Sequence, residues 1–222
     1  RWAMVGMAPL PPALKQSFEE AFGVRLQQSY GLSETFLFAS GTNRFITPPS
    51  AIGRVLPGYE VTIRDAAGAP CPAGSEGEIE VKGEYLFDGY LNAPAPAPVP
   101  FRTGDVGKFD AEGFLYVTGR IKDIIIKGGL NINPLEIENV LQRFPGIQEA
   151  AVVGAPDEIQ GEEIVAFLQF AQGAASDVHA VSRFCKKHLP PVKLPARFCI
   201  LESFPRNSSG KILKRELIRR AS

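Results

Sequence analysis

The segment GRIKDIIIKGGLNINPLEIE, residues 119–138, passes from a charged turn through an apolar run to a glycine pair and then to a helix start. Asn133 is a good N-cap, Pro134 suits the first helical position, and the acidic residues that follow suit the positive end of the helix dipole. A charged β-bulge before an ordinary helix explains the apolar residues, but not the glycine pair and the charged turn together. The segment therefore predicts a strand, a tight turn and a capped helix at the start of a small α+β domain.

Three regions with different patterns of apolar residues surround this segment. Residues 10–28 carry apolar side chains at helical spacing and then an alternating run, which predicts a helix followed by a strand. Residues 52–116 are short alternating runs broken by Gly, Pro and Asp, which predicts antiparallel β structure with an extended Pro-rich connector at 93–100. After the opening segment we expect strands at 147–153 and 197–201 and helices at 176–188 and 211–220.

The predicted fold class is α/β and α+β. Residues 1–121 are expected to end a large domain with a strand-helix-strand unit and an antiparallel β subdomain, and residues 122–222 to form a small α+β domain. The chain opens with Arg1-Trp2 rather than an initiator Met, and we therefore expect a fragment whose first part is absent.

Composition excludes several classes of protein. Lys plus Arg and Asp plus Glu number 24 each in 222 residues, so no overall field attracts nucleic acid or an anionic membrane. No apolar run is long enough for a membrane span. Three scattered cysteines without a CxxC pair argue against a zinc site and a disulfide framework, and they favour a reducing, cytoplasmic location.

The hexapeptide YGLSET, residues 30–35, is the first candidate for a ligand site. Tyr30 could stack on a base, Gly31 could let backbone approach, Ser33 could donate to a phosphate, and Glu34 could hold a magnesium ion. An ordinary loop with a gap-filling tyrosine and a helix-capping serine explains the same residues. By itself the hexapeptide therefore leaves both interpretations open.

Two further motifs are equally ambiguous alone. In Phe101-Arg102-Thr103-Gly104-Asp105, a carboxylate after a tight glycine turn could accept hydrogen bonds from both hydroxyls of a ribose, or Asp105 could be a plain turn residue. In residues 205–211, PRNSSGK, a flexible loop could present Lys211 to a phosphate, or the lysine could mark a solvated helix start.

The order of the motifs is more specific than any one of them. YGxSE, RTGD, GRxKDxIIxxGGxNIxPxEIE and PRNxSGK, in that order, closely resemble the C-terminal half of the adenylate-forming superfamily, specifically the acyl-CoA synthetases, or AMP-dependent ligases. The resemblance covers essentially the whole chain, beginning with the segment Gly6-Met7-Ala8-Pro9. It implies that residues 1–121 end the large AMP-binding domain and that residues 122–222 form the small mobile C-terminal domain.

The resemblance also implies a two-step reaction. A small carboxylic acid attacks the α-phosphate of ATP to give acyl-adenylate and pyrophosphate, and the thiol of coenzyme A then displaces AMP. Mg²⁺ would accompany the nucleotide. The roles carried over are an acyl and adenine pocket at Gly6, Met7 and Ala8; nucleotide contacts at Tyr30, Gly31, Ser33, Glu34, Asp105 and Arg120; the metal ligand Glu34; a hinge at Lys122; a coenzyme A channel at Gly128 and Gly129; and the catalytic lysine Lys211.

Some features of the chain depart from this pattern or leave it open. The family's glycine-rich phosphate loop is absent, so we expect the polypeptide to be inactive without its missing half. A non-catalytic nucleotide-binding fragment is an alternative, and so is an adenylation domain that loads a carrier protein. The Gln-Val-Lys pattern of peptide synthetases is lacking at Ile124–Gly129. The acid and the oligomeric state are not determined by the sequence.

Overall fold

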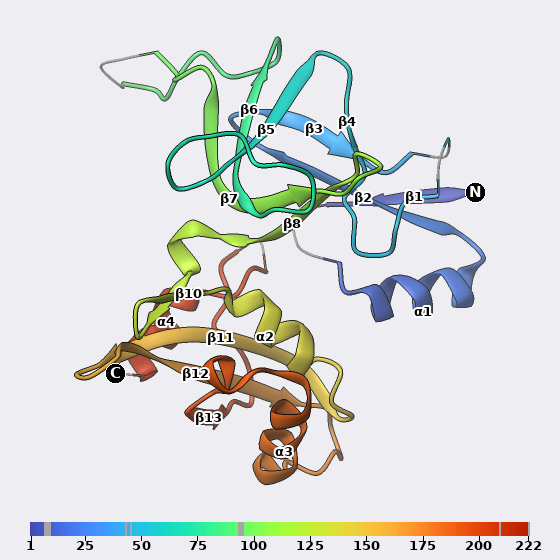
Figure 1. The fold of residues 1–222 in the computed structure, drawn as a ribbon. Coiled ribbons are helices and arrows are strands. Elements are labelled where there is room, and N and C mark those ends of the chain that lie inside the picture. Colours follow the sequence, from blue (N-terminus) through green and yellow to red (C-terminus); the bar gives the residue numbers. More distant parts are fainter. Residues whose placement is uncertain (7–9, 43, 45, 93–95, 209, 222) are drawn as a thin grey trace. The chain divides into compact units, whose positions relative to one another are not determined.

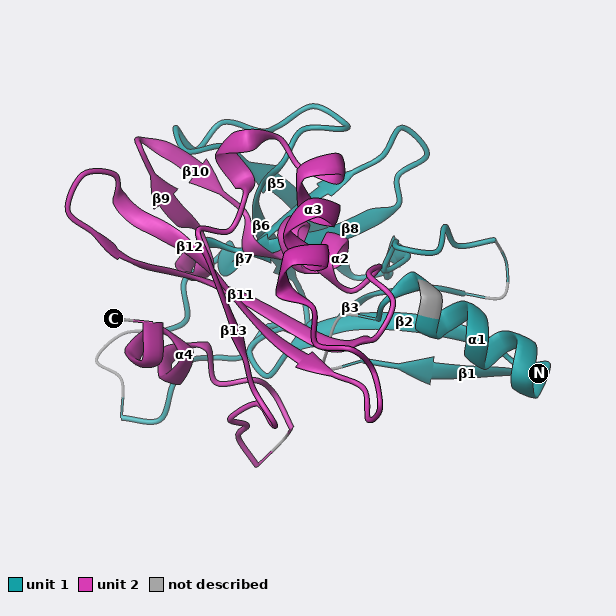
Figure 2. Ribbon diagram, turned by 90° about the horizontal axis from the view of Figure 1, so that it is seen from below, with its two compact units in different colours: residues 1–121 teal, residues 122–222 magenta. Residues whose placement is uncertain are grey.

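The structure is a computed structural model that describes residues 1–6, 10–42, 44, 46–92, 96–208 and 210–221 (Figure 1). The chain divides into two compact units, residues 1–121 and residues 122–222, which Figure 2 shows in different colours. Helices are combined with parallel and antiparallel strands, so the predicted mixed α/β and α+β fold class is confirmed. None of the helices in these described ranges has the length and apolar character needed to cross a bilayer.

The first unit begins with a strand-helix-strand motif, as predicted. Strand β1 (Trp2–Val5) pairs in parallel with β2 (Arg25–Leu32), and helix α1 (Pro12–Phe22) connects them. A proline opens α1 and Gly23 ends it in the left-handed conformation, with φ of 61°, which is common helix punctuation. Strand β3 (Phe36–Ser40) pairs antiparallel with β2, and β4 (Arg54–Val55) pairs antiparallel with β3.

The second sheet of this unit is the predicted antiparallel subdomain. It is a meander in the order β5-β6-β7-β8. Its strands are β5 (Tyr59–Arg64), β6 (Gly77–Gly83), β7 (Phe101–Phe109) and β8 (Leu115–Arg120). Apolar side chains from both sheets share one core. That core contains Phe38, Ala39, Ile52, Ile63, Ile79, Val81 and Leu115.

The RTGD motif lies within a strand rather than in the tight turn that we expected. Gly104 has φ of 71°, and β7 continues on both sides of it. Residues 103–105 lie opposite the single residue Ile79, because Arg102 pairs with Glu80 and Val106 pairs with Glu78. The glycine therefore makes a bulge in β7, and a bulge re-aims the side chains of the strand that carries it.

The second unit is a sheet covered on both faces by helices. Its sheet order is β10-β9-β12-β11, and β13 also pairs with β12. After a short 3-10 turn, η1 (Ile121–Asp123), the elements are β9 (Ile125–Lys127), β10 (Leu130–Ile132), α2 (Pro134–Leu141), β11 (Ile147–Asp157), β12 (Gly161–Phe170), α3 (Val178–His188), η2 (Pro191–Lys193), β13 (Arg197–Ile200) and α4 (Lys214–Ala221).

Strands β11 and β12 form the centre of this unit. Along β11, Ala150 and Val152 face the core that contains α2 and α3, whereas Ala151 and Val153 face the core that contains α4. This explains the unbroken apolar run at residues 150–153, since a strand buried on both faces needs no polar alternation.

The predicted start of helix α2 is confirmed, whereas the predicted start of α4 is wrong by three residues. The Asn133 side chain accepts from the N–H of Leu135 at 3.1 Å, which confirms the predicted cap of α2. Glu138 is buried in α2; its carboxylate accepts from the N–H of Val152 and pairs with Lys214, both at 2.7 Å, which ties α2 to β11 and α4. The closing helix begins at Lys214 rather than at Lys211, because residues 206–212 close a hydrogen-bonded loop before it.

Candidate functional site

A buried carboxylate is the centre of the candidate site in the first unit. Asp105 on β7 is 3% exposed and lies directly opposite Arg120 of β8 in the strand pairing. The Arg120 Nε is 2.7 Å from Asp105 Oδ1, and the Tyr30 hydroxyl on β2 donates to Asp105 Oδ2 at 2.5 Å. Three residues that are distant in the sequence and were each predicted to contact a nucleotide are thus brought together.

The electrostatics of this cluster keep Tyr30 protonated. Burial, and then the negative charge of Asp105, raise the pKa of the Tyr30 phenol well above its ordinary value. The ring packs edge-on against Phe38, with centroids 4.8 Å apart. We predicted only a stacking role for this tyrosine; the structure adds a hydroxyl that orients Asp105.

Thr35, which we did not predict as a site residue, organises the turn that carries Ser33 and Glu34. Its buried hydroxyl accepts from the N–H of Leu32 at 3.1 Å and donates to the carbonyl of Phe36 at 3.1 Å. Its own carbonyl accepts from the Tyr59 hydroxyl at 2.7 Å. Its only signal in the sequence is a small hydroxyl residue at the end of the YGLSET motif.

The close packing of strand β2 against β3 requires a glycine at position 31. A Cβ at this position would lie 2.1 Å from the carbonyl oxygen of Phe36 and 2.8 Å from the Cα of Leu37. The pairing of β2 with β3 shifts register between Tyr30 and Gly31, which brings the two backbones this close. Backbone approach was the reason that we predicted for a glycine here, but the approaching backbone in the structure is β3.

Glu34 is partly exposed and has one side-chain partner in the described residues. The Tyr90 hydroxyl donates to Glu34 Oε1 at 2.8 Å, and the N–H of Phe87 donates to the Glu34 carbonyl at 2.9 Å. The described residues contain no cluster of three or more acidic, His or Cys side chains that could hold a metal. One carboxylate still fits Mg²⁺, because this ion is commonly bound through one or two carboxylates together with substrate phosphates and water.

The other predicted site residues of the first unit are only partly described. Gly6 follows β1, and a Cβ there would meet the Ser29 hydroxyl at 2.8 Å. Met7 and Ala8 lie outside the described residues, so the acyl and adenine pocket stays a prediction.

The predicted residues of the second unit lie on two loops and at its first residue. Gly128 and Gly129 form the two-residue turn between β9 and β10, with φ of 57° and 79°. A Cβ at either position would meet nothing within 4 Å. The positive φ angles of the turn, and not crowding within the unit, therefore favour glycine at both positions. Lys122 is exposed in η1, and Lys211 is exposed in the loop before α4.

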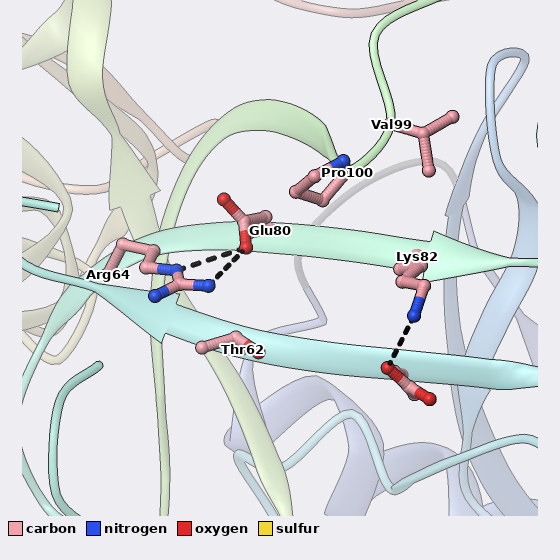
Figure 3. A pocket seen from close by; sticks show the side chains of 7 residues that line it. Thr62, Arg64, Glu80, Lys82, Val99 and Pro100 are labelled. Carbon is pink, nitrogen blue, oxygen red and sulfur yellow. Dashed lines mark hydrogen bonds and ion pairs between the residues drawn. The ribbon is translucent and has the colours of Figure 1, made fainter. Parts of the chain in front are cut away.

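A groove on the first unit contains none of the predicted residues. Its lining comes from strands β5 and β6 and from Val99 and Pro100 (Figure 3). Within it Arg64 pairs with Glu80 at 2.9 Å and Lys82 pairs with Glu60 at 3.4 Å. Because its charges compensate one another, this groove has no excess charge with which to hold an anionic nucleotide.

Comparison with known proteins identifies the family. The profile described as "AMP-binding enzyme" matches residues 1–91, and the one described as "AMP-binding enzyme C-terminal domain" matches residues 136–211. The sulfoacetate–CoA ligase of Cupriavidus necator is 37% identical over 229 aligned positions, which cover 100% of this chain and 45% of that protein. The long-chain-fatty-acid–CoA ligase of Bacillus subtilis is 38% identical, covering 96% of this chain and 39% of that protein.

The solved structures agree. ATP-bound MatB from Rhodopseudomonas palustris superposes with a TM-score of 0.93 at 32% identity, covering 98% of this chain and 44% of that one. The chain therefore belongs to the adenylate-forming superfamily of AMP-binding enzymes and is of the acyl-CoA synthetase type, which confirms the resemblance inferred from the four motifs. It spans less than half the length of each of these relatives.

Proposed function

We propose that this chain is part of an AMP-forming acid–thiol ligase, which activates a carboxylic acid with ATP and transfers the acyl group to coenzyme A. The observation that carries the proposal is the buried Asp105 carboxylate held between Tyr30 and Arg120. Relatives named as CoA ligases support it, as does the likeness to an ATP-bound structure. Those ligases are named for different acids, so the acid used here is left open.

Asp105 has the chemistry of a ribose acceptor. A carboxylate offers about four lone-pair positions, and the two hydrogen bonds from Tyr30 and Arg120 leave positions for the two hydroxyls of a ribose. Arg120 also balances the charge of Asp105, which lowers the cost of burying the carboxylate. The acceptor is therefore oriented before the nucleotide binds.

The turn at residues 33–35 would face the phosphates. Ser33 offers a hydroxyl donor on an exposed position, and Glu34 would hold Mg²⁺ together with phosphate oxygens. The ion, when bound, would neutralise charge on the pyrophosphate leaving group. Thr35 and Tyr59 hold this turn from the inside, so both functional side chains stay on its outer surface.

Lys211 would act in the first step. An oxygen of the acid attacks the α-phosphorus while pyrophosphate leaves, and the lysine ammonium reduces the repulsion between the two anions most strongly in the transition state. In the second step the thiolate of coenzyme A attacks the acyl carbonyl and AMP leaves. We propose that the second unit swings about Lys122, so that Lys211 withdraws and the turn at Gly128 and Gly129 lines the coenzyme path.

The test is an exchange chimera, in which residues 1–222 replace the matching region of the C. necator sulfoacetate–CoA ligase. With ATP, a panel of acids that includes sulfoacetate, and coenzyme A, the chimera should release pyrophosphate and form thioester. Lys211→Ala should slow pyrophosphate release at least about a hundredfold and leave thioester formation from preformed adenylate unchanged. Lys187→Ala, an exposed lysine on α3, is the matched control.

Two outcomes would count against this proposal. A folded chimera that binds ATP but releases no pyrophosphate with any acid would favour a nucleotide-binding module instead. Equal loss of both half-reactions in Lys211→Ala would refute the role given to the lysine.

A further inference from the structure

The loop that carries Lys211 is closed by hydrogen bonds around the lysine backbone. The N–H of Lys211 donates to the Asn207 side-chain oxygen at 2.9 Å, and the N–H of Asn207 donates to the Lys211 carbonyl at 3.0 Å. Arg206 and Ile212 pair as an isolated bridge, and Leu213 N–H donates to the carbonyl of Pro205 at 2.8 Å. The direction of the Lys211 side chain therefore depends on the orientation of the whole loop.

One guanidinium connects this loop to the central hairpin of the second unit. Arg206 Nη1 donates to the carbonyl of Gly210, the residue before Lys211, at 2.9 Å. Arg206 Nη2 forms an ion pair with the Glu149 carboxylate on β11. The planar fork of an arginine can hold two acceptors in fixed directions, which an ammonium group cannot do.

Glu149 lies beside an irregularity of its strand. The pairing of β11 with β12 shifts register between Ile147 and Glu149. The Glu149 side chain is 26% exposed and that of Arg206 is 40% exposed, so the pair is partly screened from water. Further along the chain, the ion pair between Lys214 and the buried Glu138 fixes the start of α4. The loop is thus anchored on both sides of Lys211.

We propose that Glu149 is a positioning residue for Lys211, acting through Arg206 to set the orientation of the lysine loop during adenylation. This inference rests on the catalytic role proposed for Lys211. It assigns no contact with substrate to Glu149. Its consequence is that loss of the carboxylate slows adenylation alone, because thioester formation does not use the lysine.

The second unit offers a matched control. Arg197 on β13 pairs with Glu163 on β12 at 2.5 Å, with side-chain exposures of 46% and 22%, similar to those of the pair at Arg206. Removal of Glu163 therefore deletes a comparable ion pair, whose arginine contacts the carbonyl of Ala221 at the far end of α4 and not the loop of Lys211. The test compares Glu149→Ala, Glu149→Gln and Arg206→Lys with Glu163→Ala.

The first measurement is amide hydrogen exchange at Lys211 in the 222-residue chain. Glu149→Ala and Arg206→Lys should speed exchange of this amide about tenfold, whereas Glu163→Ala should leave it unchanged, since only the first two break the connection that Arg206 makes between the loop and Glu149. Glu149→Gln keeps an acceptor oxygen and should show a smaller effect. Unchanged exchange in Glu149→Ala, or an equal change in Glu163→Ala, would overturn the proposal.

The second measurement uses the exchange chimera. Glu149→Ala should lower kcat for pyrophosphate release about tenfold with little change in KM for ATP, and leave thioester formation from preformed adenylate at the wild-type rate. Equal slowing of both steps would show a merely structural role. A wild-type chimera that releases no pyrophosphate would count against the proposed function, and the amide exchange would still decide whether Glu149 orders the loop.

Discussion

At the scale of single residues, the Tyr30 hydroxyl is expected to contribute to the stability of the first unit, because its acceptor is a buried charge. It donates to Asp105 at 2.5 Å, and Asp105 is nearly inaccessible to water. Tyr30→Phe keeps the ring against Phe38 and leaves one carboxylate oxygen without this donor. We expect the free energy of unfolding of the first unit to fall by about 1.5–3 kcal/mol, measured in urea by the fluorescence of Trp2, the only tryptophan.

A second tyrosine provides the control for this variant. The Tyr59 hydroxyl donates to the neutral carbonyl of Thr35, so Tyr59→Phe should lower the free energy of unfolding by only about 0.5–1.5 kcal/mol.

The effect of Tyr30→Phe on stability should also depend on pH. Burial and Asp105 raise the pKa of Tyr30 in the folded chain above the ordinary 10.0, so this phenol ionises near pH 10 only in the unfolded chain. The stability advantage of the wild type over Tyr30→Phe should therefore shrink as the pH rises above 10, and a constant difference would contradict this account.

Sequence motifs identified residues better than they identified contacts. Tyr30, Asp105 and Arg120 were each selected from a separate motif, and the structure brings all three together. The bond between Tyr30 and Asp105 joins positions 75 residues apart, and no local pattern encodes such a pair. Thr35 was missed for a similar reason, since its partners are mostly backbone groups, which carry no signal in the sequence.

At the scale of elements, the sequence predicts where helices α1 and α2 are capped or end. It does not predict features that depend on contacts between distant segments. The cap of α2 and the end of α1 follow from Asn133, Pro134 and Gly23. Strand β12 was not predicted; its run from Ile164 to Leu168 is buried on both faces and, like the run in β11, lacks the alternation that marks a half-exposed strand. The last helix was predicted too early, because the Lys211 carbonyl accepts from the N–H of Asn207 and Ile212 pairs with Arg206, so the helix begins only after them.

The β9–β10 turn allows the coenzyme channel to be tested without disturbing the fold. Gly128→Asn creates an Asn-Gly pair, the favoured sequence for a two-residue turn with positive φ at both positions, so the melting temperature should change by less than about 3 °C. The added side chain would enter open space within the unit. In the exchange chimera we expect a raised KM for coenzyme A and unchanged adenylation. Unchanged kinetics in both steps would mean that Gly128 serves the turn alone.

At the scale of the whole molecule, the boundary between the two units is the position of the proposed hinge. The first unit ends at Ile121 and the second begins at Lys122, inside the short turn η1. The exposed Lys122 side chain makes no ion pair within the described residues. A residue at such a position can change its backbone angles without breaking a side-chain ion pair, as suits a hinge residue.

Lys122→Pro tests the hinge directly, because proline fixes φ near −65° and also restricts the residue before it. If the two half-reactions require different arrangements of the units, the variant in the exchange chimera should lose one half-reaction by at least about tenfold and retain the other. Pyrophosphate release and thioester formation from preformed adenylate measure the two steps separately. Lys122→Ala removes the same side chain but keeps the backbone free, so it should perform both steps at nearly the wild-type rate. Equal losses in both half-reactions, or the same loss in the alanine variant, would show that Lys122 contributes to something other than domain alternation.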